Sequence, residues 1–273
     1  MSTEISWTDE TWNPTVGCSR VSAGCDNCYA MKVAHRGLTE AHKGLTFYDD
    51  SGEHRSGNGG IDWTGEVRVM PDRLDTPLHW RKPRRVFVDS MSDLFHDDVP
   101  VEFIQSVWVT MCKTPQHTYQ VLTKRPARMM RLLNAAPDWV VKLATLPNVW
   151  LGTSIENDRY ARIRIPHLLR TPAAVRFLSV EPMLGDVDLH PYLDQGIGWV
   201  IVGGESGPGA RPIDLAWVER VIVDCEAAGV PVFVKQLGSV WAKEHGAADR
   251  KGGAPAEWPK HLRVRVFPES VPA

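Results

Sequence analysis

Three cysteines lie within eleven residues near the start of the chain, in the order Cys18, Cys25 and Cys28, the last two as Cys-x-x-Cys. Thiolates are soft ligands that select zinc, copper(I) or iron–sulfur clusters. The other two cysteines, Cys112 and Cys225, fall on apolar faces of predicted helices and are expected to be packing residues. The spacing therefore predicts one metal centre held by the first three thiols.

Three thiolates are compatible with more than one kind of centre. A structural zinc site normally has four protein ligands, and His35 could complete a Cys₃His set for a binding module. A [4Fe–4S] cluster held by three cysteines leaves one iron open to a small molecule, which a catalytic cluster needs. An iron–sulfur protein that uses its cluster only for structure or electron transfer is the third alternative.

Charged and polar residues also follow six short apolar runs that read as strands. The carboxyl ends of parallel strands meet at one edge of a sheet, so these residues are expected to converge there and form a polar mouth. The predicted strands are Arg85–Asp89, Tyr119–Leu122, Val149–Gly152, Arg176–Ser179, Trp199–Val202 and Val232–Val234.

Helical patterns alternate with these strands, at Val101–Lys113, Pro126–Leu133, Asp158–Leu169 and Leu215–Ala228. The alternation predicts an α/β fold, a partial or complete TIM-like (β/α) barrel with parallel strands. We expect a single barrel domain over residues 1–241, with a polar insertion or lid at 37–66, and a C-terminal extension over 242–273. Additional strands are expected at Ser6–Thr11 and, as an edge, at Leu262–Phe267.

Composition limits the class of protein. The chain has 273 residues, 43% of them hydrophobic, which excludes a disordered chain, and five cysteines, too sparse for a disulfide framework. No signal peptide or membrane span is visible, so a cytoplasmic protein with no membrane partner is expected. The formal net charge of −2 predicts no strong overall attraction to nucleic acid.

Several motifs resemble those of a known superfamily. The segment Cys25-x-x-Cys28-Tyr29 resembles the end of the cysteine motif of the radical S-adenosylmethionine superfamily, although six residues rather than three separate Cys18 from Cys25. More specifically, the chain resembles the phage-associated three-cysteine-motif proteins over residues 6–240. That likeness rests on the segments Trp-Asn-Pro-Thr-x-Gly-Cys, Asp-Ser-Met-Ser-Asp-Leu-Phe and Gly-Gly-Glu-Ser.

The resemblance implies an enzyme with two cofactors, a [4Fe–4S] cluster on Cys18, Cys25 and Cys28, and S-adenosylmethionine. Reduction of the sulfonium would give a 5′-deoxyadenosyl radical that abstracts hydrogen from a substrate. An electron donor such as a flavodoxin or a ferredoxin is implied as a partner. The reaction that follows is left open.

The resemblance also suggests contacts to S-adenosylmethionine. Tyr29 would lie against the adenine, and Lys124 or Arg125 would bind the carboxylate. The candidates for the amino group are Ser90, Ser92 and Asp93, and those for the ribose are Ser154, Glu156 and Glu181. The candidate relay or substrate groups are Glu205, Lys235 and Tyr119.

Basic residues crowd the stretches Lys124–Arg131 and Arg159–Arg170. If these stretches line the mouth, they favour a nucleotide or nucleic-acid substrate, whose phosphates they would contact. The alternative is that they are solvated outer faces of helices.

Overall fold

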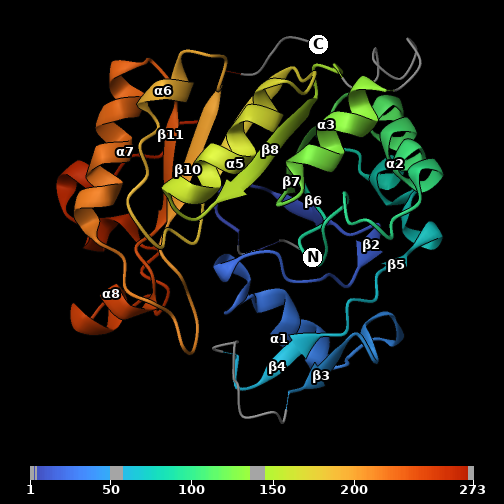
Figure 1. Cartoon of the computed structure of the whole chain (residues 1–273), viewed down its shortest axis with the longest axis horizontal. Coiled ribbons are helices and arrows are strands. Elements are labelled where there is room, and N and C mark those ends of the chain that lie inside the picture. Colours follow the sequence, from blue (N-terminus) through green and yellow to red (C-terminus); the bar gives the residue numbers. More distant parts are fainter. Residues whose placement is uncertain (1–2, 4, 50–57, 136–144, 270–273) are drawn as a thin grey trace.

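A curled sheet of seven parallel strands forms the centre of the molecule, in the order β1-β6-β7-β8-β9-β10-β11 (Figure 1). The computed structural model describes residues 3, 5–49, 58–135 and 145–269. The sheet curls into a half-barrel, which confirms the predicted α/β fold as a partial TIM-like barrel. Its strands are β1 (Glu10–Trp12), β6 (Arg85–Val88), β7 (Thr118–Thr123), β8 (Val149–Ile155), β9 (Val175–Val180), β10 (Trp199–Gly203) and β11 (Val232–Gln236).

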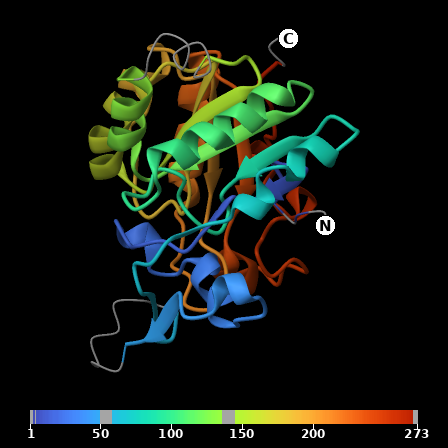
Figure 2. The same ribbon diagram turned by 90° about the vertical axis from the view of Figure 1, so that its right-hand side faces the viewer.

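Helices cover the outer face of this sheet (Figures 1 and 2). Each of the four predicted helices is present within a residue of its expected bounds. The helices that follow the strands are α2 (Val101–Lys113), α3 (Pro126–Asn134), α5 (Asp158–Leu169), α6 (His190–Leu193), α7 (Leu215–Ala227) and α8 (Ser239–Glu244). Among the described residues, no helix is long and apolar enough to cross a membrane.

Alternation along the strands separates two cores. Val86, Tyr119 and Val149 are paired neighbours whose side chains face the helices and join the larger core. The inner face instead carries an aromatic cluster that includes Phe177 and fills the interior of the half-barrel. Gly152 allows this packing, because a Cβ there would lie 2.5 Å from the Phe177 ring.

The N-terminal part forms a small unit below the carboxyl ends of the strands (Figures 1 and 2). It consists of β2 (Thr15–Val16) paired with β5 (Arg68–Val69), of α1 (Tyr29–His35), and of the hairpin β3 (Thr46–Tyr48) and β4 (Ile61–Trp63).

This unit includes the segment expected as a polar insertion or lid at 37–66. Leu45 and Trp63 of that segment are buried in a third apolar core together with Met31 of α1. Two large apolar residues separated by a long polar stretch are enough to fix a hairpin, although they leave little periodicity to detect. The described part of the segment is therefore packed structure.

The C-terminal extension belongs to the barrel. Trp258 and Leu262 are buried in the main core, and Arg265 pairs with Phe233 of β11 by a single antiparallel bridge. The predicted strand at Leu262–Phe267 is thus reduced to that bridge. The remaining short helical turns are η1 (Ala23–Cys25), η2 (Glu40–His42), η3 (Pro71–Arg73), η4 (Thr76–His79), η5 (Pro255–Glu257) and η6 (Lys260–Leu262).

Candidate functional site

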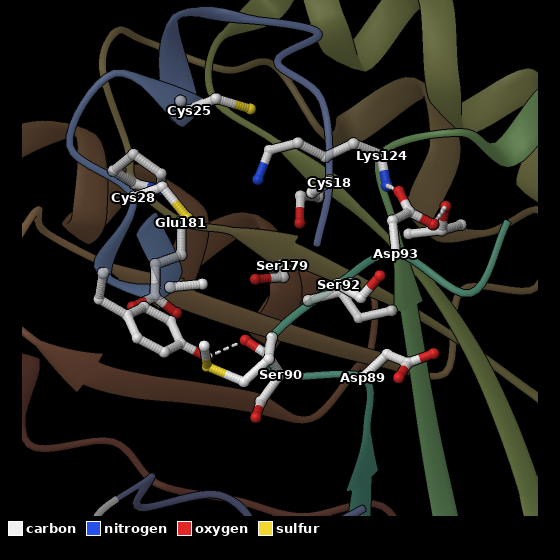
Figure 3. Close-up of a pocket in the computed structure, with 18 of the residues that line it drawn as sticks. Cys18, Cys25, Cys28, Asp89, Ser90, Ser92, Asp93, Lys124, Ser179 and Glu181 are labelled. Atoms are coloured by element: carbon white, nitrogen blue, oxygen red, sulfur yellow. Dashed lines mark hydrogen bonds between the residues drawn. The ribbon is translucent and has the colours of Figure 1, made fainter. Parts of the chain in front are cut away.

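A pocket of about 230 Å³ lies between the carboxyl ends of the strands and the cysteine loop, by which we mean residues 17–28 (Figure 3). Most of the residues predicted from the sequence meet there. Those that line the pocket are Cys18, Cys25, Cys28, Tyr29, Ser90, Ser92, Asp93, Lys124, Arg125, Ser154, Glu181, Glu205 and Lys235.

Tyr119 lies elsewhere, and the prediction that it belongs to the site is wrong. Its side chain points to the helix layer, where its hydroxyl and that of Thr114 are 2.6 Å apart. Burial raises the pKa of the Tyr119 phenol to about 12. Strand alternation decides this, since Gln120, the next residue, faces the barrel interior and its side-chain amide donates to the Trp7 carbonyl.

The three thiols share one environment. Burial raises the pKa of Cys18 to about 12, and the neighbouring Asp93 carboxylate adds to the shift, as do the other two cysteines. Burial likewise raises the pKa of Cys28. Figure 3 shows the sulfurs of Cys25 and Cys28 and the ammonium of Lys124 pointing into the same space. The raised pKa values of Cys18 and Cys28 mean that metal binding at these two thiols must displace their protons.

The Cys₃His alternative does not match the geometry. In the described part of the chain, no three His, Cys, Asp or Glu side chains stand together as ligands of one metal ion. His35 interacts with the Thr46 hydroxyl at 3.2 Å and packs edge-on against Tyr48. The thiols line one pocket without meeting at one point.

A first buried ion pair holds the start of the cysteine loop. Arg125 lies 3.0 Å from Asp93 and donates to the carbonyl and hydroxyl of Ser19 at 3.1 and 2.7 Å. Asp93 also accepts from the Thr123 hydroxyl at 2.6 Å and from the Lys124 amide at 3.0 Å. Asp93 and Arg125, predicted to bind the cofactor's amino acid end, are thus already occupied by each other and by the loop.

A second ion pair holds the middle of the loop. Glu156, which is fully buried and does not line the pocket, lies 3.1 Å from Arg164 of α5 and accepts from Ser22 at 2.7 Å. Gly24 packs on this carboxylate, since a Cβ there would lie 2.5 Å from it. The predicted ribose contact by Glu156 is therefore corrected to a structural role, and the Lys124 ammonium lies 3.9 Å away.

A third ion pair, between Glu205 and Arg211, holds the end of the loop. The two groups are 2.5 Å apart, and Glu205 also accepts from Asn27 at 2.8 Å. Burial alone would raise the pKa of Glu205, but the hydrogen bonds from Arg211 outweigh it and lower that pKa. Glu205, predicted as a relay or substrate group, is an ionised carboxylate bound to the cysteine loop.

The opposite wall of the pocket is less occupied. Glu181 at the end of β9 pairs with Lys235 of β11, and the two side chains are 18% and 19% exposed. Ser154 and Ser179 are paired neighbours on β8 and β9, buried and lining the pocket. This wall therefore offers polar groups to a ligand.

Asp89 is a pocket residue that sequence reasoning did not select. It is buried, has a φ of 61°, and accepts from the Thr15 amide at 3.0 Å, while its other oxygen has no partner. Burial raises its pKa to about 8. An Asp directly after a strand, before Ser-Met-Ser, gives only a turn signal, so the sequence did not distinguish it. Ser179 was also missed because it reads as an ordinary strand residue, and Asn27 and Arg211 because their partners include residues far away along the chain.

The basic stretches do not line the mouth as a whole. Arg128 points inward and donates to the Val99 carbonyl at 2.7 Å, and Arg164 is buried. Arg159, Arg162 and Arg170 are exposed on α5, on the outer helix layer. The interpretation as solvated helix faces therefore holds for these three arginines.

Fold and site together define a class of protein, a parallel half-barrel whose pocket is closed by a loop carrying three cysteines. The chain belongs to the family described as "Protein of unknown function (DUF5131)", whose profile matches residues 2–262. Comparison with curated proteins found no match, and comparison with solved structures found none either.

Proposed function

We propose that the protein is a [4Fe–4S]-dependent radical S-adenosylmethionine enzyme of the cytoplasm. The observation that carries this proposal is that Cys18, Cys25 and Cys28 all line one pocket at the carboxyl ends of a parallel half-barrel. Pockets at this end of parallel βα folds are where catalytic groups gather. A three-cysteine cluster also has the open coordination site that small-molecule chemistry requires.

The residues present fit such a cluster. Its three thiolates would add negative charge to the pocket, and the Lys124 ammonium lies where it interacts favourably with Cys25 and Cys28. When bound, the cluster supplies one electron to the sulfonium of the adenosyl donor, which cleaves a carbon–sulfur bond. Three ion pairs, each with a buried carboxylate, order the cysteine loop and would hold the cluster in one position.

The wall of the pocket opposite the cysteine loop, formed by Glu181, Lys235, Ser154 and Ser179 and called here the β9–β11 wall, is the proposed binding surface for the adenosyl donor. Glu181 and Lys235 carry opposite charges and match the ammonium and carboxylate of an amino acid group. Ser154 and Ser179 present hydroxyls to the ribose or the base. Tyr29, whose hydroxyl donates to the Ser90 carbonyl at 2.6 Å, forms a flat side wall next to the cysteines.

The inner end of the pocket excludes water. Trp7, Phe87 and Leu122 form an apolar floor, and the first two are at most 9% exposed. A reactive radical is protected from side reactions when its surroundings are dry and rigid. This floor would keep water away from a ligand bound at the inner end of the pocket.

For the substrate we propose a nucleotide rather than a nucleic-acid chain. Arg125 and Lys124 at the mouth are the basic residues of the first stretch that line the pocket. The exposed arginines of α5 lie on the outer layer, so a polymer would find no continuous basic track into the pocket. A single phosphate group needs no such track.

The test is anaerobic purification followed by analysis of iron, sulfide and zinc. The expected result is four irons and four sulfides per chain, and 5′-deoxyadenosine as product when dithionite and S-adenosylmethionine are added. One zinc per chain without iron would contradict the proposal. Iron and sulfide with no 5′-deoxyadenosine would favour a non-catalytic cluster instead.

A further inference from the structure

We infer that Glu205 and Arg211, on the loop after β10, are positioning residues that hold the Cys25–Cys28 segment in its metal-binding conformation. The inference rests on the proposed function for what that segment binds, but its contacts belong to the protein alone. It gives the Gly-Gly-Glu-Ser sequence after β10 a structural role.

Glu205 reaches the cysteine loop through Asn27, which lies between the two cysteines of the Cys-x-x-Cys segment. The Asn27 amide donates to the Glu205 carboxylate at 2.8 Å and to the Gly209 carbonyl at 2.8 Å. Both side chains are buried, Asn27 being 8% and Glu205 6% exposed. One side chain between the two ligands is thus fixed at two points by the β10 loop.

Arg211 fixes the residues on the other side of Cys25. Its guanidinium donates to the Ala23 carbonyl at 2.9 Å and to Asp26 at 3.2 Å, besides its bonds to Glu205. A planar guanidinium can serve three acceptors at once, which an ammonium cannot do with the same geometry. Residues 23, 26 and 27 are therefore all held by one Glu–Arg pair.

The backbone of this loop is anchored independently. Glu205 accepts from the Ser239 amide at 2.9 Å, and Gln236 donates to the Gly204 carbonyl at 2.9 Å. The segments after β10 and β11 pack so closely that a Cβ on Gly204 would lie 2.5 Å from the Leu237 carbonyl. Gly238, with a φ of 92°, approaches Glu205 from the other side. The backbone that carries the Glu205 carboxylate is consequently held in place.

The first experiment measures amide hydrogen exchange in the metal-free protein, so that it does not depend on what the cysteines bind. In Arg211→Ala, peptides covering residues 23–35 should exchange roughly tenfold faster than in the wild type, because a buried carboxylate loses its partner. Arg211→Lys should restore part of the protection. The matched control is Arg220→Ala, an exposed arginine paired with Asp186, which should leave this segment unchanged.

The second experiment reconstitutes the same variants with iron and sulfide and records their electron paramagnetic resonance spectra. Arg211→Ala should bind less iron or give an altered signal, and Asn27→Ala should do the same without removing a charge. If both variants exchange and reconstitute like the wild type, the positioning role is overturned. If the wild type binds no iron while the amides of residues 23–35 still exchange faster in Arg211→Ala, the positioning role of Glu205 and Arg211 is supported and the proposed function fails.

Discussion

The two walls of the pocket use their charged groups differently. On the side of the cysteine loop, Asp93 and Glu205, which line the pocket, and Glu156, which does not, each accept several hydrogen bonds and each bind an arginine. On the side of β9 and β11, Glu181 and Lys235 bind each other and face the pocket.

The difference separates residues that build the site from residues that are available to a ligand. A buried carboxylate with all its oxygens occupied has little capacity left for a substrate, and removing its partner leaves a buried charge. An ion pair that is about one-fifth exposed can exchange partners with a ligand at much lower cost. Substitutions on the side of the cysteine loop should therefore lower stability, whereas those on the side of β9 and β11 should weaken ligand binding.

The largest expected effect is loss of the metal centre. Changing any one of Cys18, Cys25 or Cys28 to Ala should abolish a brown chromophore absorbing at ~400 nm, because a three-thiolate site has no spare ligand. Cys112→Ala is the control, since that thiol is exposed, contrary to the packing role expected from the sequence, and lies outside the pocket. An absorption spectrum of the reconstituted protein decides this, and loss of colour in the control would contradict the ligand assignment.

Next in size is the effect of breaking the ion pair under the loop. Arg164→Ala leaves the fully buried Glu156 without its partner and should lower the free energy of unfolding by about 3–5 kcal/mol. Arg162→Ala on the same helix removes an exposed pair with Asp158 and should change it by less than about 0.5 kcal/mol. Urea unfolding compares the two, and equal effects would contradict the structural role assigned to the buried Glu156–Arg164 pair.

The β9–β11 wall should respond in affinity rather than in stability. Lys235→Ala should weaken binding of S-adenosylmethionine roughly ten- to a hundredfold, because one charge-assisted contact is worth about 1.5–3 kcal/mol. Iron content should stay the same. Lys243→Ala, an exposed lysine on α8, serves as the control. Calorimetric titration showing unchanged affinity for Lys235→Ala would place the donor elsewhere.

Asp89 should make stability depend on pH. Its pKa is about 8 in the folded chain, against an ordinary value of 3.8, so between these values the folded state binds a proton that the unfolded state lacks. The free energy of unfolding should therefore fall as pH rises from about 4 to 8. Asp89→Asn should be more stable than the wild type at pH 9, by about 1–3 kcal/mol, and no more stable at pH 4. Unfolding curves across this range test the sign.

The smallest expected effect concerns the outer arginines. Replacing Arg159 and Arg162 together by Ala should leave any binding of single-stranded DNA or tRNA, and its salt dependence, unchanged. If either arginine bound a phosphate, its removal would flatten the plot of log affinity against log salt concentration by roughly one unit of slope. Measuring affinity between low and physiological salt tests this, and a flatter slope would return nucleic acid chains to the substrate proposal.

Sequence reasoning reached the strands, helices and cysteine site because each has a local signal. Runs such as Arg85–Val88 are apolar on both faces, and Cys-x-x-Cys is visible in four residues. The roles of Glu156 and Glu205 could not be predicted in this way. Their partners, Ser22 and Asn27, are 134 and 178 residues away along the chain, and no local pattern reports such contacts. A charged residue at a strand end correctly predicted that its side chain lies near the site, but the side chain binds the cysteine loop and not a ligand.

The aromatic floor of the half-barrel has one more consequence. Trp7, from the segment before β1, and Phe267, near the other end of the described chain, both pack on Trp199 of β10. Segments near both ends of the described chain therefore meet on one tryptophan and together close the aromatic floor at the open side of the half-barrel, between β1 and β11.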